Sequence, residues 1–222
     1  AGAISDVNRM ALVVRHPLPY VYLAREVLGA AGVPSQMFDA LPLASEPHAA
    51  ALDLVIDFVR GNFGRRPAIA LLRSPHFRLG ADAAPRLTLR DVAALDRDLS
   101  GRGYLGGIDT LERLVAAWRE EEPGSRPPGG LRAAEVVLEA ARELAPLRSA
   151  VPCAAQLDRL LAFLRRHEHL PRTDDPLRPR LLRGRAAVLD ALTGLRDAYA
   201  RFDPLAVDFD AVAAVIRRWI DA

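Results

Sequence analysis

Apolar residues recur at helical spacing over most of the chain. From Glu46 onward, Leu52, Val55, Ile56 and Val59 stand at i, i+3, i+4 and i+7, the spacing of one face of an α-helix. The same spacing recurs further along, around 67–73, 88–99, 111–118, 137–144, 157–164, 182–202 and 212–219. We therefore expect a mainly α fold with a multi-helix body.

The start of the chain follows a different pattern. The apolar run MALVVR at 10–15 is short enough for a buried strand. Pro17 or Pro19 suits the first turn of a following helix, where a missing N–H costs little, and Gly32 suits its end. The segment 34–38 is a weaker candidate for a second strand. Together these features predict a small, partial α/β (β-α-β) start with a right-handed crossover.

These patterns divide the chain into a partial α/β, motor-like segment at 1–45 and a helical domain at 46–222. The stretch EEEPGSRPPGG at 120–130 is charged and rich in proline and glycine, and it marks a candidate sub-boundary. Two strands alone make a poor parallel sheet, because such sheets need helices on both faces. We therefore expect the chain to be a piece of a larger protein.

The composition narrows the chemistry that the chain can perform. All 30 of its Lys+Arg residues are arginine, so a Walker A loop, Schiff-base catalysis and a PD-(D/E)XK nuclease site all lack their lysine. Cys153 is the single cysteine and permits no internal disulfide. No apolar run approaches the ~20 residues of a membrane span, and no signal peptide is visible. We expect a cytoplasmic protein with no cofactor and no membrane contact.

Two motifs resemble ligand-binding sites, but their context favours a structural role over ligand binding. Gly101, Gly103 and Gly106 form a G-x-G-x-x-G pattern, which a dinucleotide site requires directly after a strand. A helix precedes it here, so we expect a helix–helix turn. His167 and His169 stand at i and i+2 and point to different helix faces, which favours a solvated helix end over a metal site.

Two other positions also favour structure over chemistry. Cys153 lies near a predicted helix start, where its pKa could fall, but its alanine neighbours favour a core position. Asp174 and Asp175 in the TDDP stretch favour a turn over a pair of metal ligands. We therefore assign no catalytic and no metal-binding residue.

Arginine clusters are the candidates for binding. Guanidinium groups grip phosphates through charge-assisted hydrogen bonds, with salt-dependent affinity. Because 28 acids leave a net charge of only +2, a uniformly basic nucleic-acid-binding domain is not indicated, and arginine as a generic surface cation is the alternative. The candidate DNA-binding residues form three groups: Arg65, Arg66, Arg73 and Arg78; Arg165 and Arg166 together with Arg172; and Arg178, Arg180, Arg183 and Arg185.

The stretch of about residues 8 to 120 resembles a known family. It carries a Gly-Val-Pro turn at 32–34, the LRSP element at 72–75 and YLGG at 104–107. In this order the motifs resemble the region where the second motor domain of UvrD/RecB-type superfamily 1 helicases gives way to an inserted helical domain. The resemblance is closest to AddB-like subunits, which are associated with a PD-(D/E)XK nuclease.

The resemblance implies a function without catalysis in this chain. Active helicases carry an aromatic pair, an arginine and a Glu-Ile/Val-Lys-Asp run after the second strand, whereas this chain has LASEPH at 43–48. The implied role is a non-catalytic helical region of an ATP-dependent helicase/exonuclease in DNA double-strand break repair and recombination. Its implied partners are DNA, as a duplex end or a single strand, and a helicase/nuclease subunit. The alternative is a stand-alone helical protein–protein interaction module.

Overall fold

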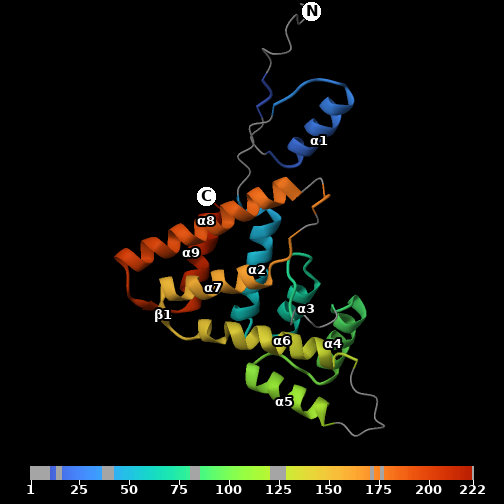
Figure 1. The fold of residues 1–222 in the computed structure, drawn as a ribbon, viewed down its shortest axis with the longest axis vertical. Coiled ribbons are helices and arrows are strands. Elements are labelled where there is room, and N and C mark those ends of the chain that lie inside the picture. Colours follow the sequence, from blue (N-terminus) through green and yellow to red (C-terminus); the bar gives the residue numbers. More distant parts are fainter. Residues whose placement is uncertain are drawn as a thin grey trace, which may run out of the picture. The chain divides into compact units, whose positions relative to one another are not determined.

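The computed structural model describes residues 11–13, 17–36, 43–80, 86–120, 129–170, 173–175 and 178–221. Helices dominate these ranges, which confirms the expected mainly α fold (Figure 1). The chain divides into two compact units, Ala1–Leu41 and Pro42–Ala222, and each is described by itself. Within the described ranges, every helix is too short or too polar to span a lipid bilayer.

The first unit contains helix α1, Pro17–Ala30. The helix begins at a proline, as predicted, and the chain turns at Gly32, whose φ of +66° is left-handed. The expected strands are not seen in the described residues, because 11–13 and 34–36 have no regular structure and Leu12 and Val13 are exposed. The remainder of both expected strands lies outside the described residues.

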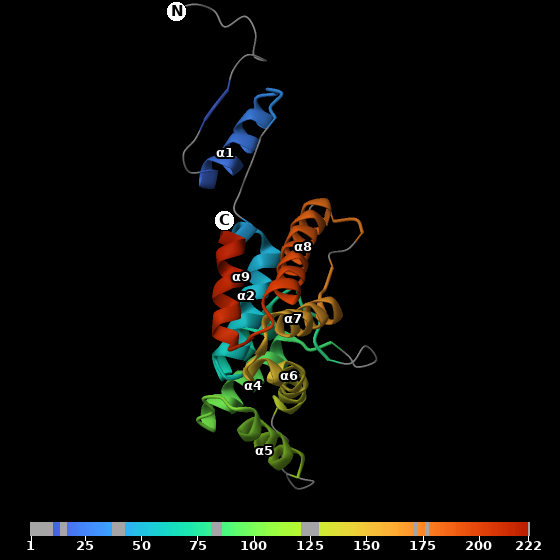
Figure 2. The same ribbon diagram turned by 90° about the vertical axis from the view of Figure 1, so that its left-hand side faces the viewer.

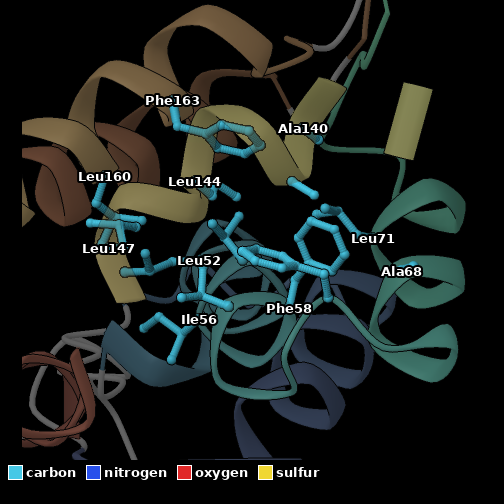
Figure 3. Close-up of a cluster of buried hydrophobic side chains, with 14 of the residues drawn as sticks. Leu52, Ile56, Phe58, Ala68, Leu71, Ala140, Leu144, Leu147, Leu160 and Phe163 are labelled. Atoms are coloured by element: carbon cyan, nitrogen blue, oxygen red, sulfur yellow. The ribbon is translucent and has the colours of Figure 1, made fainter. Parts of the chain in front are cut away.

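Helix α2, Pro47–Arg60, follows the 3-10 turn η2, Leu43–Ser45, and supplies much of the core of the second unit. The apolar residues at helical spacing form its buried face, and Leu52, Val55 and Ile56 are fully buried. Burying a side chain of this size contributes about 1.5–3 kcal/mol. Figure 3 shows Leu52, Ile56 and Phe58 of this helix in one cluster with residues of other helices, among them Leu71, Leu144 and Phe163.

Three helices follow α2: α3 is Arg65–Arg73, α4 is Leu89–Gly101 and α5 is Ile108–Arg119. Helix α4 begins with a capping box, in which Thr88 and Asp91 exchange side-chain and backbone hydrogen bonds. This arrangement satisfies N–H groups that the helix itself leaves without partners.

The G-x-G-x-x-G stretch forms the turn between α4 and α5, as predicted. The hydroxyl of Tyr104 donates to the carbonyl of Phe63 at 2.9 Å, and the N–H of Gly107 donates to the carbonyl of Asn62 at 2.7 Å. A Cβ at Gly106 would lie 2.9 Å from that same carbonyl oxygen, so only glycine permits this approach. The stretch therefore holds the turn between α4 and α5 against the turn that follows α2.

The remaining helices are α6, Leu131–Leu144; α7, Cys153–His167; α8, Arg178–Phe202; and α9, Phe209–Asp221. Helices α5 and α6, on either side of the candidate sub-boundary at 120–130, pack against each other. Helix α8 packs on α7, α2 and α9, and Figure 2 shows α9, α2 and α8 side by side. A 3-10 turn, η3 at Ala145–Arg148, joins α6 to the segment before α7.

The pattern of apolar residues did not predict the short strands β1, Val151–Pro152, and β2, Ala206–Val207, which pair antiparallel. Gln156 is fully buried beneath them, and its Nε2 donates to the carbonyls of Val151 and Val207 at 3.2 and 2.6 Å. The amide therefore ties the start of α7 to the segment before α9.

Candidate nucleic-acid interface

Two of the arginine groups meet through backbone pairing. The segment after α3 forms an antiparallel bridge between Phe77 and Glu168, just beyond the end of α7. The N–H of Arg78 donates to the carbonyl of His167, and the N–H of His169 donates to the carbonyl of His76, both at 2.7 Å. Arg78 consequently lines the same hollow as Arg166, which belongs to a different sequence group.

The third group reaches the same region through acidic residues. Arg185 on α8 binds the carboxylate of Glu168 through Nε and Nη2. Arg180 lies 3.4 Å from Glu46, the residue before α2. Arg78, Arg166 and Arg185, one member of each sequence group, thus lie around the end of α7, a relationship that spacing along the chain does not reveal.

Ion pairing separates the candidate arginines into two classes. Arg65 pairs with Asp96 at 3.2 Å and Arg166 with Glu143 at 3.5 Å, and Arg180 and Arg185 have the partners given above. Among the candidate arginines that the structure describes, those that are exposed and have no ion pair are Arg66, Arg73, Arg78, Arg165 and Arg183. Arg178 is partly buried and has an interaction partner, and Arg172 lies outside the described residues.

Glu168, His48 and His76 form a partly buried polar cluster next to the end of α7. Glu168 is largely buried and lies 3.8 Å from the ring of His48, whose ring centroid is 6.5 Å from that of His76. Burial lowers the pKa of His48, and this effect outweighs the nearby Glu168 carboxylate, which raises it. Burial also lowers the pKa of His76. Both imidazoles are therefore mainly neutral at pH 7.

A groove runs between the segment 74–80 and α6. Its larger part encloses about 500 Å³, and a neighbouring hollow of about 370 Å³ shares Arg78, Val136 and Glu139 with it. Arg86 and Arg132 also line the larger part, and sequence reasoning missed both. Each is isolated among apolar or acidic neighbours in the sequence, so no clustering signal marked them.

The histidine prediction was partly wrong. Helix α7 ends at His167 as expected, but the side chain is only 14% exposed and is not solvated. Its Nε2 lies 2.8 Å from a carboxylate oxygen of Glu143, and its ring packs on Phe163 at 4.6 Å between centroids. Periodicity could not show the contact with Glu143, because that residue comes from a different helix, α6. Among the described residues, no group of histidine, cysteine and carboxylate side chains could hold a metal ion.

The other two expectations agree with the structure. Cys153 is buried at the start of α7, and burial raises the pKa of its thiol to about 11, with Asp203 adding to the effect. The thiol is therefore protonated at neutral pH and is a poor nucleophile. Residues 173 and 174 form a turn, as predicted for the TDDP stretch.

Comparisons with known proteins add no assignment to this geometry. No protein-family model, no curated protein and no solved structure matches the chain.

Proposed function

We propose that this chain is a non-catalytic helical scaffold that guides DNA within an AddB-like helicase/exonuclease acting in double-strand break repair. The observation that carries the proposal is the pairing of 76–78 with 167–169, which joins two arginine groups that lie far apart in the sequence. The resemblance of residues 8 to 120 to AddB-like subunits supplies the biological setting.

The proposed mechanism is electrostatic tracking of the DNA backbone. Arg73, Arg78 and Arg165 are exposed, and no ion pair within the described residues engages them. Guanidinium groups of this kind displace counterions from phosphates, which makes binding salt-dependent and independent of base sequence. The paired arginines hold the scaffold in shape, while the unpaired ones contact DNA. The helical body also packs against a helicase/nuclease partner subunit.

Binding of fluorescein-labelled DNA, followed by anisotropy across a salt series, tests the proposal. The triple variant Arg73→Gln, Arg78→Gln and Arg165→Gln should bind a duplex end or single strand more weakly. Its slope of log K against log salt should shrink by up to about 0.9 per lost phosphate contact on duplex DNA. The matched control is Arg90→Gln, Arg97→Gln and Arg218→Gln, which removes three exposed charges elsewhere. Equal losses in the two triple variants would show a bulk charge effect and would refute the assigned surface.

A second candidate function is protein–protein interaction, and the groove between 74–80 and α6 favours it. The groove has an apolar floor formed by Leu71, Phe77 and Leu87, which a phosphate backbone would not use. Purified chain that fails to bind DNA at low salt but recognises a peptide would favour this candidate over the first.

A further inference from the structure

We propose that the groove between the segment 74–80 and α6 binds an extended peptide of a partner protein that carries apolar side chains and, toward one end, acidic residues. The inference goes beyond DNA guidance and does not depend on it. It rests on the floor of the groove, the open backbone edge beside it and the distribution of charge along its walls.

The size and floor of the groove suit apolar side chains. Its larger part encloses about 500 Å³, within the range of roughly 300–1,000 Å³ that is typical of ligand clefts. Leu71 is buried at its base, and Phe77, Leu79 and Leu87 are partly exposed around it. Gly80, at φ +99°, keeps the wall open, because a Cβ there would come within 3.3 Å of Val136.

The backbone of the segment 77–79 offers a place for an extended chain. Its bonds to 167–169 use the carbonyl of His76 and the N–H of Arg78. Groups of successive residues in an extended segment point to opposite sides, so the N–H and C=O of Phe77 and Leu79 face away from 167–169. Within the described residues these groups have no backbone hydrogen-bond partner, and both residues line the groove. A peptide strand added at such an edge gains main-chain hydrogen bonds.

The charges along the groove indicate which end of it would bind the acidic residues of the peptide. Arg86 and Arg132 line only the larger part, and neither lies within ion-pair distance of a carboxylate in the described ranges, although Arg132 interacts with Asp91 at longer range. The nearby acid, Glu135, is already bound by Arg119 at 2.7 Å. This end of the groove is therefore positive, which favours carboxylates of a partner.

The rest of the groove is electrically balanced. Arg78 and Glu139 line both hollows with opposite charges. In the smaller hollow, Glu143 is engaged by Arg166 and His167. Because carboxylates on α6 repel phosphates, an alternating wall of this kind suits a peptide better than a nucleic-acid strand.

Selection from a displayed library of random twelve-residue peptides tests the proposal with the full chain as bait. Enriched peptides should combine leucine-like side chains with aspartate or glutamate near one end. The charge-reversed variants Arg86→Glu and Arg132→Glu should each weaken a selected peptide about ten-fold, as like charges replace opposite ones. The matched control Arg90→Glu lies on the first turn of α4 outside the groove and should bind normally.

A second variant tests the apolar lining of the groove separately, at Val136 in its wall. Val136→Gln should weaken the same peptide while leaving DNA affinity unchanged, because it alters no charge. Circular dichroism and thermal unfolding verify that each variant folds. Selection of no peptide, selection of basic peptides, or binding indifferent to Arg86, Arg132 and Val136 would overturn the proposal. DNA that binds in the groove and is weakened by Val136→Gln would assign the groove to nucleic acid instead. That result would also overturn the proposal.

Discussion

Arg185 binds Glu168 through two guanidinium nitrogens and so joins α8 to the end of α7. The side chain of Glu168 is 11% exposed and that of Arg185 is 26% exposed. Charge-assisted, bidentate pairs of this kind combine strength with fixed geometry. The pair also fixes the segment that bridges to Phe77, and so it holds together the region where the arginine groups converge.

Replacing Arg185 with methionine should destabilise the chain by about 2 kcal/mol. Breaking a buried pair leaves one charge without its partner and costs roughly 3–5 kcal/mol, and the partial exposure of Arg185 reduces this value. The control is Arg60→Met, which breaks an exposed pair with Asp210 and should cost at most about 1 kcal/mol. Urea unfolding gives both values. Equal costs would show that the Arg185 pair has no special structural role.

Stability should fall as the pH drops from 7.5 to 5.5. The pKa of His48 is lowered mainly by burial, and that of His76 is lowered by burial. The unfolded chain, with histidine pKa values near 6.5, therefore binds protons in this window that the folded chain does not, so acid favours unfolding. The double variant His48→Gln and His76→Gln should show a smaller decline in the urea midpoint. An unchanged decline would assign the pH dependence to other groups.

Two glycines of α8 should respond in opposite ways to alanine. Gly194 has open space around its missing Cβ, so Gly194→Ala should stabilise the helix by about 0.5–1 kcal/mol. A Cβ at Gly184 would lie 2.8 Å from Oε2 of Glu46, an oxygen that is buried without a hydrogen-bond partner. Gly184→Ala should therefore be neutral or destabilising. Thermal unfolding compares them, and equal stabilisation would mean that the Glu46 carboxylate moves away freely.

The helices were largely predictable because their signals are local. The spacing of Leu52, Val55 and Ile56 predicts a buried face, and all three are fully buried in α2. Periodicity does not say whether a neighbouring element covers a face. Trp219 shares the apolar spacing of α9, yet it is 59% exposed. The two-residue strands β1 and β2 are too short to leave a pattern in the sequence.

The arrangement of the candidate site was not predictable from sequence, because its contacts join distant segments. Composition identified the arginine groups, and the run from Arg178 to Arg185 contains no acid. The fold brings Glu46 and Glu168 to that run from two other elements. The sequence thus predicted that arginines would form the candidate DNA-binding site. Ion pairs between distant segments determine which of their guanidinium groups remain free to contact a phosphate.

Gln156 provides a test of the buried amide beneath the two strands. Replacing it with methionine leaves the carbonyls of Val151 and Val207 without that donor, which should cost about 1–3 kcal/mol. Gln156→Glu should cost more at pH 7 than at pH 4, because an ionised carboxylate cannot donate to a carbonyl. Urea unfolding at both pH values measures the difference. A cost of Gln156→Glu, measured against the unsubstituted chain at the same pH, that is larger at pH 4 than at pH 7 would contradict the assigned donor role.

Arg183 and Arg180 separate DNA contact from structural pairing within one helix. Arg183 is exposed and has no ion pair in the described residues, whereas Arg180 pairs with Glu46. Arg183→Gln should weaken DNA binding, lower the salt slope by about 0.9 and leave the melting temperature unchanged. Arg180→Gln should lower the melting temperature and change DNA affinity less. Because both substitutions remove one positive charge, a bulk electrostatic effect would reduce affinity equally. Equal losses in the anisotropy titration would therefore contradict a role for Arg183 in direct contact, whatever the effect on stability.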